Sequence, residues 1–243
     1  MYLVLGAAMG TLGGLFGIGG GLVAIPALGV LFGLEQQLAQ GTALLMVLPN
    51  VLLALWRYNQ RNRVSLRNAL MLIVPSFAFA WLTSLWAVRL DPQAMRLGFV
   101  GFLIVLTLFN LAQMYWRMTP SGTGLRYGRW LWLLGVVSGI TGGMFGVGGG
   151  VVATPILTSV FGATQVVAQG LALALAAPST GITLLTYALH NHVNWAMGIP
   201  LAIGGLASIS WGVKLAHSLR ERTLRAWFCV FLIFCSAILA FKI

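Results

Sequence analysis

Charge is what this sequence has least of. Charged residues make up only 7% of its 243 residues, whereas 59% are hydrophobic, and the mean hydropathy is +0.95. A soluble domain carries about a quarter charged residues, so this composition excludes a soluble globular protein. We expect an integral membrane protein that leaves no length for a separate soluble domain.

Acidic residues are the scarcest charged groups. The chain has three, Glu35, Asp91 and Glu221, and each lies at the end of an apolar segment. With no carboxylate inside a segment, nothing there would bind a cation or repel an anion, which argues against a cation carrier. The fourteen Lys and Arg residues also lie at or near segment ends, so the net charge of +11 describes the loops. We therefore expect no nucleic-acid partner.

Cysteine and histidine are also few. Cys229 and Cys235 lie in one apolar segment, six residues apart, which is too far along a helix axis for a disulfide. His190 and His192, in "HNHVNW", are expected in a solvated loop. The sequence shows no cluster of Cys, His and Asp and no arrangement of a nucleophile with a base. We therefore expect neither an enzyme nor a metal site or other cofactor.

Long apolar runs are abundant instead. Runs of membrane-spanning length predict an all-α polytopic protein of the inner (cytoplasmic) membrane with about eight hydrophobic segments. They lie near residues 3–33, 38–56, 66–88, 95–115, 130–161, 166–188, 195–216 and 224–241.

The chain is an internal duplication. When Gly13 is placed over Gly142, "GGLFGIGGGLVAIPAL" (13–28) aligns with "GGMFGVGGGVVATPIL" (142–157), and 20 of the 37 positions from Gly13 to Pro49 are identical. The sequence therefore predicts two homologous halves of four segments each: an N-terminal repeat (1–115), a polar linker (116–129) and a C-terminal repeat (130–243). Because the first segment has a second copy, it is not expected to be a cleaved signal peptide.

Two topologies fit these segments. If all eight cross the membrane, the repeats are parallel and the Lys and Arg residues divide 8 to 6 between the two faces. If the first segment of each half turns at its glycines and leaves on the side it entered, the repeats are inverted and the division is 11 to 3. The positive-inside rule favours the second arrangement, with the termini outside. The cytoplasmic residues would be Arg57, Arg61, Arg63, Arg67, Arg117, Arg126, Arg129, Lys214, Arg220, Arg222 and Arg225.

Segment length favours the same arrangement. A straight helix over residues 3–33 would be about 46 Å long, whereas the hydrocarbon core is about 30 Å thick. Strong tilt is the alternative. We expect inverted repeats in which a glycine-broken re-entrant helical hairpin opens each half.

The glycine runs "GIGGG" (17–21) and "GVGGG" (146–150) are the candidate site. Irregular backbone is tolerated at membrane depth only where protein or a water-filled cavity satisfies its polar groups. Each run precedes a second helical arm, whose first N–H groups and positive dipole end favour an anion. A role in packing alone remains the alternative. The glycines assigned to substrate binding are Gly17, Gly19, Gly20, Gly21, Gly146, Gly148, Gly149 and Gly150.

Five side chains are expected to add hydrogen-bond donors: Gln40, Gln169, Asn50, Ser179 and Thr180. Asn50 and Ser179 follow prolines that are expected to interrupt their helices at depth. The glutamines open the next helix of each half, and helix capping at the interface is their alternative role. A separate stripe with a spacing of four is expected to pack helices closely. It comprises Gly6, Gly10, Gly14, Gly135, Gly139 and Gly143.

Each glycine-rich stretch is followed by "FG" and then by "AQG" (39–41 and 168–170), and the second half adds "HVNW" (192–195). With these features, nearly the whole sequence resembles the TauE/SafE sulfite exporter family (TSUP) of bacterial membrane transporters. The resemblance implies a secondary transporter that exports small sulfur-containing anions such as sulfite, sulfoacetate or other organosulfonates. A passive anion channel, or a permease for another small oxyanion, is the alternative.

The chain departs from the family at two points. Gly41-Thr42-Ala43 and Gly170-Leu171-Ala172 stand where the family commonly has Gly-Thr-Ser, and Asn194 replaces an aspartate. The resemblance therefore does not transfer one particular substrate. The expected partners are a sulfur-containing anion and the lipid bilayer, and a homodimer stays open.

Overall fold

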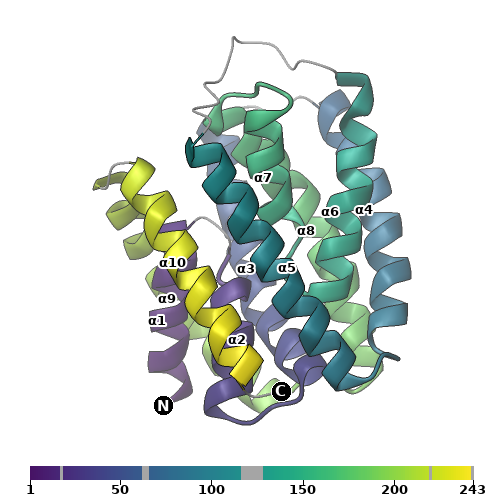
Figure 1. Cartoon of the computed structure of the whole chain (residues 1–243), viewed down its shortest axis with the longest axis vertical. Coiled ribbons are helices and arrows are strands. Elements are labelled where there is room, and N and C mark those ends of the chain that lie inside the picture. The colour runs from purple at the N-terminus through teal and green to yellow at the C-terminus, as the bar shows by residue number, and fades with distance from the viewer. Residues whose placement is uncertain (17–18, 62–65, 116–127, 219–220, 242–243) are drawn as a thin grey trace.

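The structure is a computed structural model that describes residues 1–16, 19–61, 66–115, 128–218 and 221–241 (Figure 1). The first half contains α1 (Tyr2–Phe16), α2 (Gly21–Leu31), α3 (Gln36–Arg61), α4 (Leu66–Ala87) and α5 (Pro92–Tyr115). The second half contains a 3-10 turn, η1 (Gly128–Trp130), and α6 (Leu131–Phe145), α7 (Gly150–Ser159), α8 (Gln165–Leu189), α9 (Trp195–Ser218) and α10 (Glu221–Phe241). The described ranges contain no strand, so the prediction of an all-α protein is confirmed.

Five helices are long and apolar enough to cross a membrane: α3, α4, α5, α8 and α9. The apolar stretches of α1, α2, α6, α7 and α10 are shorter. In each half, the first apolar segment of the sequence is divided into two short helices at its glycine run. These helices are typical of a multi-pass membrane protein. The exposed tryptophans on the outside of the bundle agree with this, among them Trp81, Trp86 and Trp211.

The helices of the two halves correspond one to one. In the alignment that places Gly13 over Gly142, every helix of the second half begins opposite the first residue of its counterpart, from Tyr2 and Leu131 in α1 and α6 to Pro92 and Glu221 in α5 and α10. Their packing is exchanged between the halves: α1 packs most extensively against α9, and α6 packs most extensively against α4. Each half therefore buries the broken helix of the other, and the core is shared between them.

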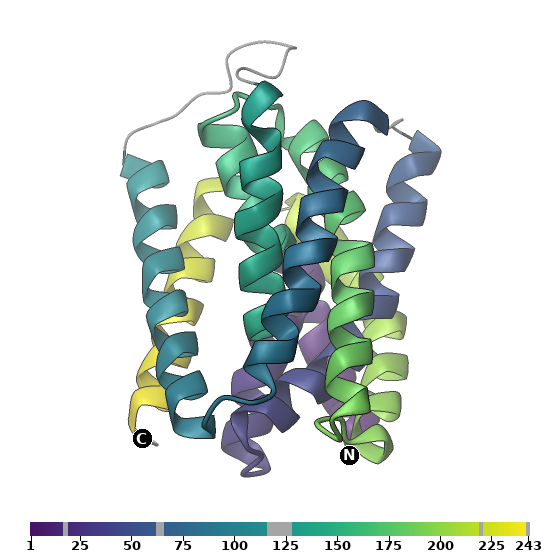
Figure 2. The ribbon, with the colours of Figure 1, turned by 90° about the vertical axis from the view of Figure 1, so that its right-hand side faces the viewer.

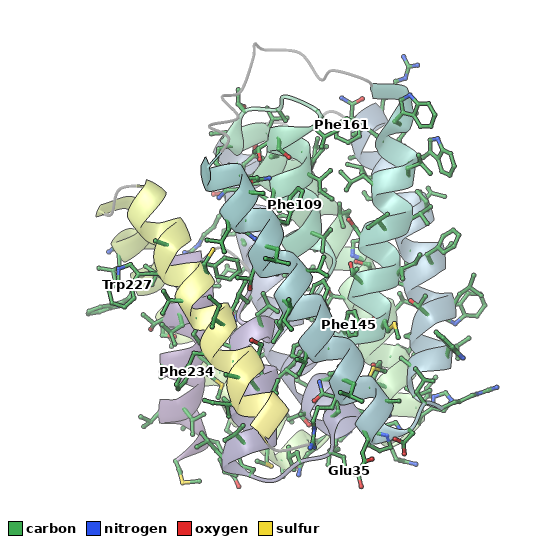
Figure 3. The ribbon with its side chains drawn as sticks, in the orientation of Figure 1. Glu35, Phe109, Phe145, Phe161, Trp227 and Phe234 are labelled. Carbon is green, nitrogen blue, oxygen red and sulfur yellow. The ribbon has the colours of Figure 1, made fainter. Side chains whose placement is uncertain are left out.

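The two broken helices enter the bundle from opposite ends. We call the end that holds Phe161 the upper end and the end that holds Glu35 the lower end (Figure 3). Helix α1 starts at the N-terminus, at the lower end, and α2 returns to Glu35 at that same end (Figures 1 and 3). Helix α6 descends from the upper end to Phe145, and α7 returns toward Phe161 (Figure 3). Figure 2 shows the N-terminus and the end of α10 at the lower end.

The glycine stripes lie where these helices meet their partners. A Cβ atom at Gly10 would touch the backbone of Gly205 in α9, and one at Gly139 would touch the backbone of Ser76 in α4. Gly6, Gly135 and Gly143 make equally close approaches to main-chain atoms. Backbone cannot move aside as a flexible side chain can, so these five glycines have the packing role that their spacing predicts.

Alanine at Gly139 is expected to destabilise the protein. Its Cβ would lie 2.5 Å from the carbonyl oxygen of Ser76, and overpacking of this kind costs about 1–3 kcal/mol. The control is Gly101→Ala on α5, because a Cβ there would meet nothing within 4 Å. Thermal unfolding in detergent should show a lower Tm for Gly139→Ala than for Gly101→Ala. Equal Tm values would contradict the packing role.

The prediction that prolines interrupt the second segment of each half is wrong. Helix α3 continues through Pro49 and α8 through Pro178. A proline removes one main-chain hydrogen bond, and transmembrane helices tolerate that loss where neighbouring helices enclose them. Asn50 and Ser179 are therefore presented by continuous helices rather than by breaks.

Candidate functional site: the two glycine breaks

Positive φ angles mark both breaks. Gly19 and Gly20 have φ values of 69° and 93°, and Gly148 and Gly149, their counterparts in the second half, have values of 73° and 38°. Gly146 is left-handed as well, with φ of 67°. Only glycine adopts these conformations without a steric penalty, so the glycine runs permit the reversal between the paired helices. Gly17 lies outside the described residues.

The two breaks touch each other inside the bundle. A Cβ atom at Gly21 would lie 3.5 Å from the carbonyl oxygen of Gly146 and 3.6 Å from the Cα atom of Val147. The Val47 side chain of α3 lies against both breaks, 3.4 Å from the Cβ position of Gly19 and 3.5 Å from that of Gly148. The fold therefore brings the two glycine runs of the sequence into one place, with a single valine between them.

The second break holds main-chain donors without acceptors. Among the described residues, no hydrogen-bond acceptor meets the N–H groups of Val147, Gly148, Gly149 or Val151, all of which are buried. The first N–H groups of a helix have no partner within the helix, and here they belong to buried residues, so a ligand or water has to satisfy them. They lie at the start of α7, where the helix dipole also favours negative charge.

Gln40 brings a side-chain donor to this break. The residue is fully buried on α3, and its Cβ atom lies 3.2 Å from the Cβ position of Gly146. Its Oε1 atom accepts a hydrogen bond of 2.9 Å from the Tyr187 hydroxyl, whereas its Nε2 atom is buried without a partner. The Tyr187 hydroxyl therefore fixes the Gln40 amide through its oxygen, and both N–H groups of that amide lack an acceptor.

Thr180 brings a second side-chain donor. A Cβ atom at Gly148 would lie 2.8 Å from Thr180 Oγ1, which is buried and has no hydrogen-bond partner. The neighbouring Ser179 differs, because its hydroxyl donates to the carbonyl oxygen of Leu175 at 2.8 Å. Of these two predicted donors, only Thr180 is unengaged at the break.

The other predicted residues occupy different surroundings. Asn50 is fully buried at the first break, where its Nδ2 atom donates to the carbonyl oxygen of Gly19 at 3.2 Å. Gln169 is exposed on the first turns of α8, so the structure does not bring it to the breaks. Asn194 caps α9 by accepting from the N–H of Met197 at 3.1 Å.

Tyr187 is the residue of this region that the sequence interpretation missed. Its hydroxyl lies 2.9 Å from Gln40 Oε1 and 3.2 Å from the carbonyl oxygen of Met144, two residues before Gly146. The sequence does hold a signal, since Tyr58 occupies the equivalent position of the first half. Phe145 fixes the same stretch by stacking on Phe102, with ring centroids 4.8 Å apart.

The site offers donors to an anion and has no ligand set for a metal. No group of three or more His, Cys, Asp or Glu side chains occurs in the part of the chain that the structure describes. The donors around the second break come from three helices: main-chain N–H groups of α7 and its preceding break, Gln40 of α3 and Thr180 of α8. Such a set can replace part of the hydration shell of an oxyanion.

The chain is similar to known membrane transporter proteins. The family model described as "Sulfite exporter TauE/SafE" matches residues 2–239. The chain is 25% identical over 241 residues to "Probable membrane transporter protein MJ0441" of Methanocaldococcus jannaschii, which covers 93% of this chain and 89% of the relative. It is 29% identical over 223 residues to a "Probable membrane transporter protein" of Xylella fastidiosa strain Temecula1, covering 89% and 82%.

A third relative is "Probable membrane transporter protein YunE" of Bacillus subtilis strain 168, 23% identical over 247 residues, with 92% of this chain and 90% of the relative covered. The relatives are named as membrane transporters, so the prediction that the chain is not an enzyme is confirmed. The chain belongs to the TauE/SafE sulfite exporter family.

Proposed function

We propose that this protein is a secondary transporter that moves a small sulfur-containing oxyanion, such as sulfite or an organosulfonate, out of the cell across the cytoplasmic membrane. The observation that carries the proposal is the group of unpaired, buried donors at the second break: four main-chain N–H groups, Gln40 Nε2 and Thr180 Oγ1. All three acids of the sequence lie outside the apolar segments, so no carboxylate opposes an anion there. Neutral donors bind an anion without holding it too firmly for release.

The proposed topology is a pair of inverted repeats, each opened by a re-entrant hairpin. It is supported by the opposite directions of the hairpins α1–α2 and α6–α7 and by their meeting at the glycine breaks (Figure 1). In this topology the upper end of the bundle is cytoplasmic and both termini lie outside, as the division of Lys and Arg residues in the sequence favours. Binding sites near the midplane between inverted repeats are typical of secondary transporters.

Topology can be tested with single cysteines at Leu3, Glu35 and Gln60, all exposed positions, in a background without Cys229 and Cys235. An impermeant maleimide added to intact cells is expected to label positions 3 and 35 from outside. Position 60 should react only after permeabilisation. Labelling of 3 and 35 from opposite sides would show that α1 and α2 cross the membrane together and would refute the re-entrant hairpin.

Function can be tested with purified protein in proteoliposomes loaded with sulfite, sulfoacetate, thiosulfate or sulfate. A carrier is expected to show saturable efflux that is accelerated by substrate on the opposite side. Flux that does not saturate and shows no such acceleration would identify a passive channel. Absence of flux for all four anions would refute the proposed substrate class.

A further inference from the structure

Tyr58 and Tyr187 occupy equivalent positions in the two halves, in the same alignment that pairs the glycine runs. Each lies near the end of the long helix that follows its hairpin, Tyr58 in α3 and Tyr187 in α8. The sequence equivalence predicts equal surroundings for the two rings. The structure instead gives them different partners and different burial.

At the lower end, Tyr187 closes a contact between three helices. It is fully buried, and its hydroxyl joins the end of α8 to Gln40 of α3 and lies 3.2 Å from the Met144 carbonyl of α6. The connection from α8 to α9 covers the same place: the His192 carbonyl oxygen lies against Gly41, and the Asn194 N–H donates to Thr42 Oγ1 at 3.0 Å. The start of α3 is consequently enclosed.

At the upper end, the equivalent contact is not made. Tyr58 is half-buried, and its hydroxyl donates to the carbonyl oxygen of Val166 in the first turn of α8. Gln169, the counterpart of Gln40, is exposed, and so are the consecutive residues 165–167. Ala168 is buried and Gly170 lies against the Tyr58 ring, so the first turn of α8 is uncovered on part of its surface, whereas Gln36, Gln37 and Gln40 at the start of α3 are all buried.

We infer that Tyr187 and Tyr58 are two alternating gates, and that the structure holds the lower gate closed and the upper gate open. The inference rests on the proposed transport function. In the opposite state, Tyr187 releases Gln40 while Tyr58 takes Gln169 and the carbonyl of Leu15, the counterpart of Met144. Tyr187 is also a positioning residue, because its hydroxyl donates to Gln40 Oε1 and leaves Gln40 Nε2 without a partner.

The test uses single cysteines at the equivalent positions Gln36, which is buried, and Gln165, which is exposed. Both are placed in a background without Cys229 and Cys235, and maleimide labelling rates are measured in detergent without substrate. Tyr187→Phe removes only the gate hydroxyl and should speed labelling at position 36 about fivefold, the equilibrium change expected for one neutral hydrogen bond. Thr42→Val, which removes the acceptor for Asn194, should act in the same direction.

The matched variant Gln169→Ala has the opposite expected effect. Gln169 is exposed in this structure and would meet Tyr58 only when the upper gate is closed, so labelling at position 36 should slow while position 165 stays reactive. An unchanged rate at position 36 in Tyr187→Phe, or a change of the same sign in Tyr187→Phe and Gln169→Ala, would overturn the gate assignment. The readout needs no substrate, so an error in the proposed substrate class would leave these rates as predicted.

Discussion

Replacing Gly148 by alanine is expected to reduce anion flux about 100-fold while the protein still folds. The residue has φ of 73°, where an L residue costs about 1–2 kcal/mol, and the new methyl group would lie 2.8 Å from Thr180 Oγ1. The methyl would thus press against the side-chain donor that lies next to this main-chain donor. The measurement is initial efflux from proteoliposomes at matched protein density.

Gly33→Ala is the control for backbone strain. Gly33 has nearly the same φ, 66°, but a Cβ atom there would meet nothing within 4 Å. The two variants therefore share the conformational cost and differ in what the methyl group meets. Flux that falls equally in both would show that strain, and not the occupied site, is responsible.

Replacing Thr180 by valine is expected to stabilise the empty protein and weaken anion binding. A buried hydroxyl without a partner costs about 1–3 kcal/mol, and the isosteric valine removes that cost, which corresponds to a Tm higher by about 3 °C. A hydrogen bond to a charged group contributes about 1.5–3 kcal/mol, so the Kd for the transported anion should rise about 10–100-fold. A residue with only a structural role would lose stability without a change in affinity.

Two further variants of α8 sharpen this prediction. Thr180→Ser keeps the hydroxyl and should keep the affinity. Thr183→Val removes a buried hydroxyl that already donates to the carbonyl oxygen of Ser179 at 2.8 Å, so it should neither raise Tm nor change the Kd. A higher Tm together with an unchanged Kd in Thr180→Val would remove this side chain from the site.

Much of the architecture could be predicted from the sequence because its two homologous halves can be aligned with each other. The alignment that pairs the two glycine runs also pairs the first residues of all equivalent helices. Glycine spacing predicted the close packing of Gly10 and Gly139, since only a residue without Cβ permits that approach. The contact between the two glycine breaks could not be predicted from the sequence, because hydrophobic periodicity does not indicate which helices pack against each other.

The difference between equivalent residues could not be predicted in the same way. Gln40 and Gln169 have identical sequence contexts, "AQG", yet one is fully buried and the other is exposed. A repeat in the sequence implies symmetry, whereas one conformation of a transporter is asymmetric. The continuity of α3 through Pro49 was also unpredictable from local rules, because packing around the helix offsets the missing hydrogen bond.

The central claim is that main-chain N–H groups of the second break bind the transported anion, and one NMR measurement tests it directly. The sequence contains two Val-Gly pairs, Val147-Gly148 at the break and Val100-Gly101 on α5, where Gly101 is exposed. Protein labelled with carbonyl-13C valine and 15N glycine therefore gives two selected amide signals. On titration with the anion of highest flux, the Gly148 amide proton should move downfield and saturate while Gly101 stays fixed. A Gly148 signal that does not move under saturating anion, in protein that transports, would contradict the account.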